Sequence, residues 1–456
     1  MTQASKQTDP PFWRVALFAL PGAPLLALSV PPIVFLPRYY ATELGVEEGV
    51  VGLVFLAARL FDVIVNPTIG TLQDRTRTPF GRRRVWLVAA TPLLMAIVWF
   101  AFIGMPPGVG AIFVGLTVMS LYITFAGAMI AHLGWAGECA PTYHGRTRVL
   151  GVIQIASALG QVAMMATPAV VQMTNMGDFA DGVHLMGWMV IIALPICVAI
   201  AVWAMPETIA TTAATTESGF AASIRALFAS AVLRRVLVPD LLIGIVQGMA
   251  GTLFLFYADA VLNIEREATS LLFVYFFSGL VAIPFWVWLG RRIGKHTALA
   301  WSCVLWASAF AVFPIVPPNA PEILAIGMLV AGFPSTAGTL LVRSMMADAV
   351  DDDEARTGEQ RSGLYFGLLL TTSKVGLAFG PASLALLSLF GFNSDPGVEN
   401  SPLALAALTW LYCGTPALLM AVTFLSLRNY PLDEKRQGEL RAQIDARRTQ
   451  GAAAAD

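Results

Sequence analysis

The chain has 456 residues, of which 57% are hydrophobic and only 12% are charged, whereas soluble domains carry about 25% charged residues. Its formal net charge of -1 provides no basic surface, so no nucleic-acid partner is expected. Apolar runs of about 20 residues recur along the chain, and each is long enough to cross a hydrocarbon core of about 30 Å. The composition therefore excludes an ordinary soluble protein and predicts an integral membrane protein.

Twelve apolar runs follow one another along the chain. They are too long and too uniformly apolar for the strands of a membrane β-barrel, so we interpret them as helices. The predicted spans are 14–36, 48–71, 85–105, 109–137, 149–173, 184–206, 234–262, 268–290, 297–317, 321–346, 364–391 and 403–427. The expected fold class is an all-α polytopic membrane protein with twelve transmembrane helices.

The distribution of lysine and arginine predicts the orientation of these helices. If the N-terminus is cytoplasmic, the inner loops hold almost all of the basic residues, and the outer loops hold Arg38 and Arg266. Both termini are therefore expected in the cytoplasm, and the expected location is a bacterial inner membrane. The four cysteines lie on different helices without CxxC spacing, so they predict neither a disulfide framework nor a metal site.

The two halves of the chain show weak internal similarity. Gly-basic loops follow both the second and the eighth span, and a basic residue with a glycine opens both the fifth and the eleventh span. The predicted organisation is a six-helix bundle over 1–206, a cytoplasmic linker over 207–233, a second bundle over 234–428 and a cytoplasmic tail over 429–456. This organisation resembles the major facilitator architecture, in which substrate binds near the membrane midplane and access alternates.

Three segments make the resemblance more specific. They are ARLFDVIVNPTIGTLQDRTRTPFGRRR (58–84), GECAPTYHGRTR (137–148) and MMADAVDDDEARTGEQRSGLYFGLLLTTSKVGLAFG (345–380). They resemble the helix 2 signature, the loop after helix 4 and the helix 10–11 connection of the glycoside-pentoside-hexuronide:cation symporter family. With the matching hydropathy, the resemblance covers nearly the whole chain.

The second span carries Arg59, Asp62 and Asn66 on one helical face, at spacings of three and four residues. A charge in the middle of a bilayer is retained mainly where it faces water or a partner. The resemblance implies that Asp62 binds the coupling cation, Na⁺ or H⁺, with Asn66 in place of a second family acid. The alternative is an Arg59–Asp62 pair that only locks the helix against a neighbour.

Candidate substrate residues lie on other spans. Lys374, deep in the eleventh span, is expected to face the central cavity near the cation and substrate sites, the alternative being a lysine that reaches the membrane edge. The family's sugar carriers use acids in helices 1 and 4 and an arginine in helix 5, which this chain lacks. A larger or more amphipathic solute than a simple sugar is therefore expected. The remaining candidates, for which packing is the alternative role, are Gln154, His132, Trp135 and Tyr122.

Charged residues at the predicted cytoplasmic ends of the helices are candidates for an inner gate. Opposite charges at helix ends can pair and close that face, whereas the alternative for the acidic loop around 348–361 is a solvated surface. The gate candidates are Asp74, Arg75, Arg82, Glu138, Arg146 and Asp348.

These features together predict a secondary active transporter, a cation-coupled symporter of a small organic solute, acting as a monomer. An uncoupled facilitator or exporter, or a receptor or scaffold without transport, are the alternatives. The sequence has no GxSxG, P-loop or HExxH motif, so an enzyme is not expected, and neither is a cofactor beyond the coupling ion.

Overall fold

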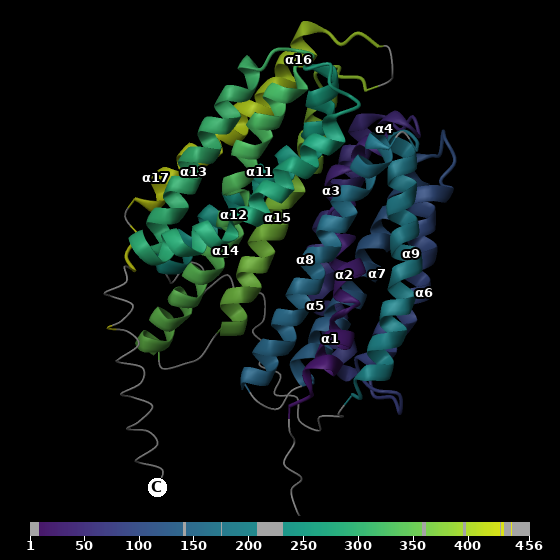
Figure 1. Ribbon diagram of the computed structural model, residues 1–456, viewed down its shortest axis with the longest axis vertical. Coiled ribbons are helices and arrows are strands. Elements are labelled where there is room, and N and C mark those ends of the chain that lie inside the picture. Colours follow the sequence, from purple (N-terminus) through teal and green to yellow (C-terminus); the bar gives the residue numbers. More distant parts are fainter. Residues whose placement is uncertain are drawn as a thin grey trace, which may run out of the picture. The chain divides into compact units, whose positions relative to one another are not determined.

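The computed structural model describes residues 9–139, 143–174, 176–207, 231–357, 362–394, 398–428, 430–432 and 439. The regular elements in these residues are helices (Figure 1). By their contacts the residues divide into two compact units. Unit 1 comprises Met1–Thr215, Glu265–Phe273 and Leu384–Ser401, and unit 2 comprises Thr216–Ile264, Val274–Ser383 and Pro402–Asp456. The predicted linker falls largely on 208–230, which lies outside the described residues, so the predicted domain boundaries remain predictions.

Unit 1 contains the helices drawn from purple to teal in Figure 1. They are α1 (Phe12–Ala19), α2 (Gly22–Ala27), α3 (Pro31–Val34), α4 (Leu36–Thr42), α5 (Glu48–Arg75), α6 (Arg84–Trp99), the π-helical turn η1 (Phe100–Gly104), α7 (Ala111–Glu138), α8 (Tyr143–Met173) and α9 (Phe179–Ala204). Apart from the first, each predicted span of this half corresponds to one continuous helical stretch.

The first predicted span is present as a candidate membrane span, Phe12–Val34, but its helix is interrupted. In place of one helix over 14–36, the structure has the four short helices α1 to α4 between Phe12 and Thr42. Pro21 precedes α2, Pro31 and Pro32 begin α3, and Pro37 lies in the first turn of α4. Proline has no N–H and clashes with the preceding turn, so repeated prolines break one long helix into short ones.

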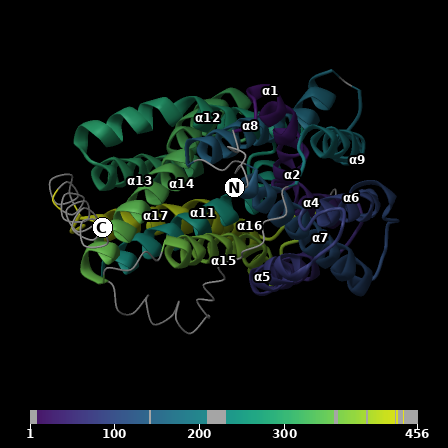
Figure 2. The same cartoon turned by 90° about the horizontal axis from the view of Figure 1, so that it is seen from below.

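The helices of unit 2 are drawn from teal to yellow (Figure 1). They are α11 (Ala231–Ala260), α12 (Ala268–Ile293), α13 (Lys295–Val312), the 3₁₀ turn η2 (Phe313–Ile315), α14 (Pro321–Thr357), α15 (Ser362–Ser388), α16 (Pro402–Thr409), the π-helical turn η3 (Trp410–Gly414) and α17 (Thr415–Leu427). The first residues of α12 and the last turn of α15 belong to unit 1 by their contacts. Helix α13 packs against both α14 and α17, as the view in Figure 2 shows.

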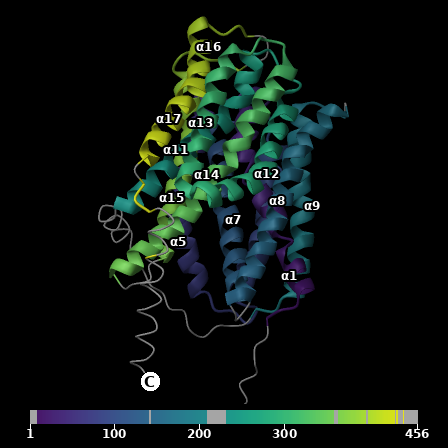
Figure 3. The ribbon, with the colours of Figure 1, turned by 60° about the vertical axis from the view of Figure 1, so that its left-hand side comes forward.

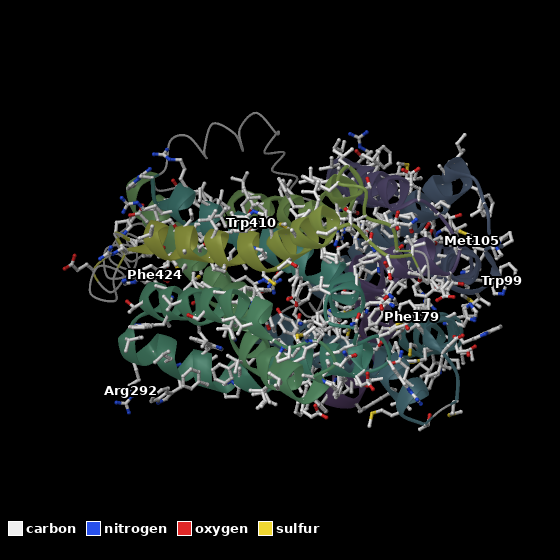
Figure 4. The ribbon with its side chains drawn as sticks, turned by 90° about the horizontal axis from the view of Figure 1, so that it is seen from above. Trp99, Met105, Phe179, Arg292, Trp410 and Phe424 are labelled. Atoms are coloured by element: carbon white, nitrogen blue, oxygen red, sulfur yellow. The ribbon has the colours of Figure 1, made fainter. Side chains whose placement is uncertain are left out.

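The described helices are those of a membrane protein. Eleven stretches of the described residues are long and apolar enough to cross a membrane. Helix α5, which carries Arg59 and Asp62, has 28 residues and is about 42 Å long at 1.5 Å per residue, which also suffices. Large apolar side chains lie on the surface of both units, for example Trp99, which is 40% exposed at an edge of unit 1 (Figure 4). The predicted all-α polytopic membrane fold is confirmed.

Small residues bring one pair of helices into close contact within each unit. In unit 1, α2 packs on α8, where a Cβ atom on Gly160 would clash with the carbonyl oxygen of Ala23 and Ser157 Oγ donates to the Gly22 carbonyl at 3.1 Å. In unit 2, α11 and α15 approach equally closely (Figure 3). Each pair joins the first and fifth span of its half. Membrane helices associate through such close backbone approach because lipid offers no hydrophobic driving force.

The α2–α8 contact predicts the effect of one added methyl group. We expect Gly160→Ala to lower the free energy of unfolding by about 1–3 kcal/mol, because the carbonyl of Ala23 leaves no room for a Cβ atom. The matched control is Gly151→Ala on the same helix, where a Cβ atom meets nothing within 4 Å. Thermal unfolding of both variants in detergent measures the difference, and equal melting temperatures would contradict the packing role of Gly160.

Candidate functional site

Helix α5 carries two buried charged side chains near its middle. Arg59 is 8% exposed and Asp62 is 4% exposed, and they lie three residues apart, about three turns from the start of the helix. Both residues act electrostatically on the hydroxyl of Tyr122, on α7. The structure therefore brings together three of the residues that the sequence singled out, within unit 1.

The guanidinium of Arg59 has unused hydrogen-bonding capacity. Its Cζ lies 5.2 Å from the centre of the Tyr122 ring, which is cation–π geometry. Its Nε and Nη2 are buried and have no hydrogen-bond acceptor in the described structure. A buried N–H without an acceptor is costly, and a charged one more so. Arg59 thus has two buried donors for which the described residues supply no acceptor.

Arg59 is also one of the residues that line a small recess in unit 1. The volume of the recess is about 20 Å³, which holds about one water molecule. Most of its wall is apolar or aromatic, and the lining residues are Leu28, Ser29, Pro32, Arg59, Leu121, Tyr122 and Phe125. A recess of this size has no room for a whole solute.

Asn66 follows Asp62 by one further turn of α5. Its Oδ1 is buried and has no hydrogen-bond partner in the described structure. An amide oxygen is a ligand for hard cations such as Na⁺ but does not take up a proton at ordinary pH. The position of Asn66 is compatible with the predicted cation site, and its role remains a prediction.

Three other candidates lie elsewhere in unit 1. His132 is fully buried, and its Nε2 lies 3.0 Å from the carbonyl oxygen of Phe18, an arrangement that requires the proton on Nε2. Trp135 is also fully buried and contacts the Phe18 ring edge-to-face at 4.9 Å. Both positions favour the packing alternative. Gln154 is exposed on α8 and does not line the recess.

Unit 2 contains a buried carboxylate that the sequence reading missed. Asp240 on α11 is 8% exposed, and its Oδ2 accepts hydrogen bonds from Thr372 Oγ1 at 2.6 Å and Ser373 Oγ at 2.8 Å. Lys374 follows directly on α15 and is half-buried. The sequence did contain a signal for this site, because Asp240 is an acid within an apolar run. It was not singled out because Asp240 lies outside the three segments that resemble the symporter family. Lys374 belongs to unit 2 and Asp62 to unit 1.

The gate candidates have different environments. Asp348 on α14 accepts from Lys295 Nζ at 2.6 Å, so this acid is paired inside unit 2. At the start of α6, the backbone N–H groups of Arg82 and Arg83 donate to Glu207 Oε1 at 2.8 and 2.7 Å. Sequence reasoning named neither Lys295 nor Glu207 as a partner. Arg75 is exposed at the end of α5, and the side chains of Asp74, Glu138 and Arg146 lie outside the described residues.

The Lys295–Asp348 pair predicts a stability effect. The side chain of Asp348 is 7% exposed and that of Lys295 is 32% exposed. Removing the lysine charge therefore leaves a mostly buried carboxylate without its counter-charge. We expect Lys295→Gln to lower the free energy of unfolding by about 1–3 kcal/mol, and Lys295→Gln combined with Asp348→Asn to recover part of that loss. Thermal unfolding of the single and double variants gives the coupling, and strict additivity would contradict the pairing.

Comparison with known proteins identifies the family. Residues 17–434 match the profile of the MFS/sugar transport protein family. The chain belongs to this family. The putative glycoside/cation symporter YagG of Escherichia coli strain K12 is 24% identical over 436 residues, covering 92% of this chain and 93% of the relative. The sodium-dependent lysophosphatidylcholine symporter 1-A of Danio rerio is 21% identical over 467 residues, covering 93% and 86%.

Solved structures show the same fold. The nucleoside transporter NupG superposes with a TM-score of 0.66 at 14% identity, covering 92% of this chain and 99% of that one. A bacterial homologue of the human lysosomal transporter Spinster gives a TM-score of 0.61 at 15% identity, covering 92% and 97%. The major facilitator fold and the resemblance to glycoside/cation symporters are confirmed. The protein is a secondary active transporter of the membrane, in line with the non-enzyme prediction.

Proposed function

We propose that the protein is a cation-coupled symporter whose solute presents an anionic group to Arg59 while the cation binds at Asp62. The observation that carries the proposal is the buried guanidinium of Arg59, whose Nε and Nη2 have no acceptor in the described structure, three residues from the buried carboxylate of Asp62. A bidentate oxyanion, such as a carboxylate or phosphate, matches the planar donor fork of arginine.

The two charges provide a physical route to coupling. The negative charge of Asp62 attracts Arg59 and repels an incoming anion. Both effects are stronger here than in water, because the protein interior is poorly polarisable. A cation bound to Asp62 neutralises that carboxylate, so the positive charge of Arg59 becomes available to the anionic group of the solute. Since coupling between two binding sites is reciprocal, the bound solute then raises the affinity for the cation by the same factor. Na⁺ and H⁺ both act in this way.

The lining of the recess supports an amphipathic solute. Around Arg59 the wall of the recess consists mainly of apolar and aromatic side chains, which offer few hydrogen bonds to the hydroxyl groups of a simple sugar. The relatives named as a glucuronide carrier homologue and as lysophosphatidylcholine symporters point to solutes in which an acidic group is joined to a larger body. We propose this shared chemistry for the solute here, with the larger body lying outside the recess.

The remaining parts of the proposal concern the setting of the transporter. We propose a monomer in a bacterial inner membrane with both termini in the cytoplasm. The relatives from Escherichia coli include an inner membrane symporter, YicJ, which supports the location. Asn66, in place of a second acid, leaves the uncoupled facilitator as the alternative. The cytoplasmic gate formed by Asp74, Arg75, Arg82, Glu138, Arg146 and Asp348 remains part of the proposal.

Removing the charge of Asp62 tests the cation role. In proteoliposomes screened with glycosides, glucuronides and lysophospholipids under Na⁺ or H⁺ gradients, we expect the wild type to accumulate one class of solute. Asp62→Asn keeps the shape of the side chain but removes its charge, so the accumulation ratio should fall to about 1 while equilibration continues. Glu47→Gln, at the exposed start of the same helix, is the matched control. Full accumulation by Asp62→Asn would contradict the cation role of Asp62, and a wild type that only equilibrates its solutes would favour the uncoupled facilitator.

Arg59→Gln tests the nature of the solute. Losing a charge-assisted bidentate contact should weaken binding of an anionic solute by about 30-fold or more, with little effect on an uncharged analogue of the same body. Arg59→Lys should restore binding only in part, because a point charge does not reproduce the planar fork. Competition binding with the paired solutes measures the difference. An equal loss for charged and uncharged solutes would argue against an anionic group at Arg59.

A further inference from the structure

Helices α11 and α15 are joined within unit 2 by facing glycines. A Cβ atom on Gly244 would lie 3.2 Å from Gly376 Cα, and one on Gly248 would lie 2.7 Å from the carbonyl oxygen of Leu377. On each helix the glycines are four residues apart, so they form one stripe on the contact face. The two backbones therefore approach each other closely along this stripe.

Asp240 lies one turn before Gly244, at the edge of this contact. Its carboxyl group reaches α15, where Oδ2 lies 2.6 Å from Thr372 Oγ1 and 2.8 Å from Ser373 Oγ. The carboxyl is largely buried, with 8% of the residue exposed. Because the glycine contact fixes the distance between the helices, these three oxygens are held together by the packing of the backbone rather than by the side chains alone.

The contacts at Thr372 are also satisfied by a proton on Asp240. The Thr372 hydroxyl has one hydrogen but lies within hydrogen-bond distance of two acceptors, Asp240 Oδ2 at 2.6 Å and the Leu369 carbonyl at 2.9 Å. If Oδ2 carries a proton, every contact is satisfied. Ser373 then donates to Oδ2, the carboxyl O–H donates to Thr372 Oγ1, and Thr372 donates to Leu369. Without that proton, the Thr372 hydrogen must be shared between two acceptors.

The spacing of the oxygens is that of hydrogen bonds rather than that of ligands around Na⁺ or Ca²⁺. Oxygen ligands lie about 2.4 Å from a cation of the size of Ca²⁺, which keeps neighbouring ligands about 3 Å or more apart. The distances of 2.6 and 2.8 Å from Asp240 Oδ2 are those of O–H···O hydrogen bonds. The ligand that fits this group of oxygens is a proton.

One charged group on a helix packed against α11 acts on the same carboxyl. Arg343 of α14 interacts electrostatically with Asp240, and Lys374 follows Ser373 in the sequence of α15. The acid Asp348, further along α14, is paired with Lys295. Helices α16 and α17 and the turn η3, which also pack on α11, contain no charged residue. Positive charge nearby stabilises the carboxylate, so the site can release a proton as well as bind one.

We propose that Asp240 is a reversible proton-binding site of unit 2, in which Oδ2 takes a proton from water and returns it there, with Thr372 and Ser373 as its positioning residues. The site is separate from the cation site proposed at Asp62, and the inference does not depend on that role. It gives the second half of the transporter its own protonation equilibrium, through which pH acts on the α11–α15 contact.

Infrared difference spectroscopy of the full-length protein in lipid nanodiscs tests this site without any solute. Lowering the pH should produce the carbonyl stretch of a buried carboxylic acid. The band should be lost in Asp240→Asn, which is isosteric, and kept in Asp259→Asn, which changes the acid at the other end of α11. It should also be kept in Asp62→Asn, so failure of the proposed cation role leaves this result unaffected.

Ser373→Ala provides a test that keeps the carboxyl group. Ser373 donates to Oδ2 in both states, but more strongly to the charged form, so its loss should move the midpoint of the band to higher pH by up to about one unit. Thermal unfolding checks that each variant is folded. A band that persists in Asp240→Asn, or the absence of any band in the folded wild type, overturns the proposal. An unchanged midpoint in Ser373→Ala overturns the positioning role.

Discussion

The cost of burying charge among apolar helices governs the arrangement of this protein. A charged side chain at the centre of a bilayer costs at least about 2.5–3.5 kcal/mol on insertion scales, and buried donors or acceptors without partners add to that cost. Arg59 and Asp62 share one face of α5, and Asp240 is bound by two hydroxyls of α15. Each of these charged side chains thus lies near an opposite charge or a hydrogen-bond donor, which lowers the cost of burying it.

The two halves solve the packing problem in the same way. In each, a backbone contact between the first and fifth span depends on residues without a bulky side chain, as at Gly160 in unit 1 and Gly376 in unit 2. Polar side chains then bond to backbone carbonyls of a neighbouring helix, as Gln73 does to Gly127 at 2.8 Å and Thr336 to Gly279 at 2.8 Å. This agreement adds to the evidence for an internal repeat, which the similar loops of the two halves indicated only weakly.

The sequence was informative where a residue type indicates one structural role on its own. Long apolar runs predicted the spans, and Arg59 and Asp62 stood out because charge is rare in such runs. Reasoning from the sequence failed where partners come from distant segments. The hydroxyls that bind Asp240 lie 132 and 133 residues away, and Lys295 and Asp348 are separated by 53 residues. The division of the first span into α1 to α4 was missed because prolines are often tolerated within membrane helices.

The carboxylate of Glu207 has a mechanical consequence. It accepts hydrogen bonds from three successive backbone N–H groups, at Arg82, Arg83 and Arg84, and Gly81, with a φ of 119°, leaves room for it where a Cβ atom would collide. A carboxylate suits the positive end of α6. Glu207, three residues after the end of α9, therefore fixes the chain that leaves this helix to the start of α6.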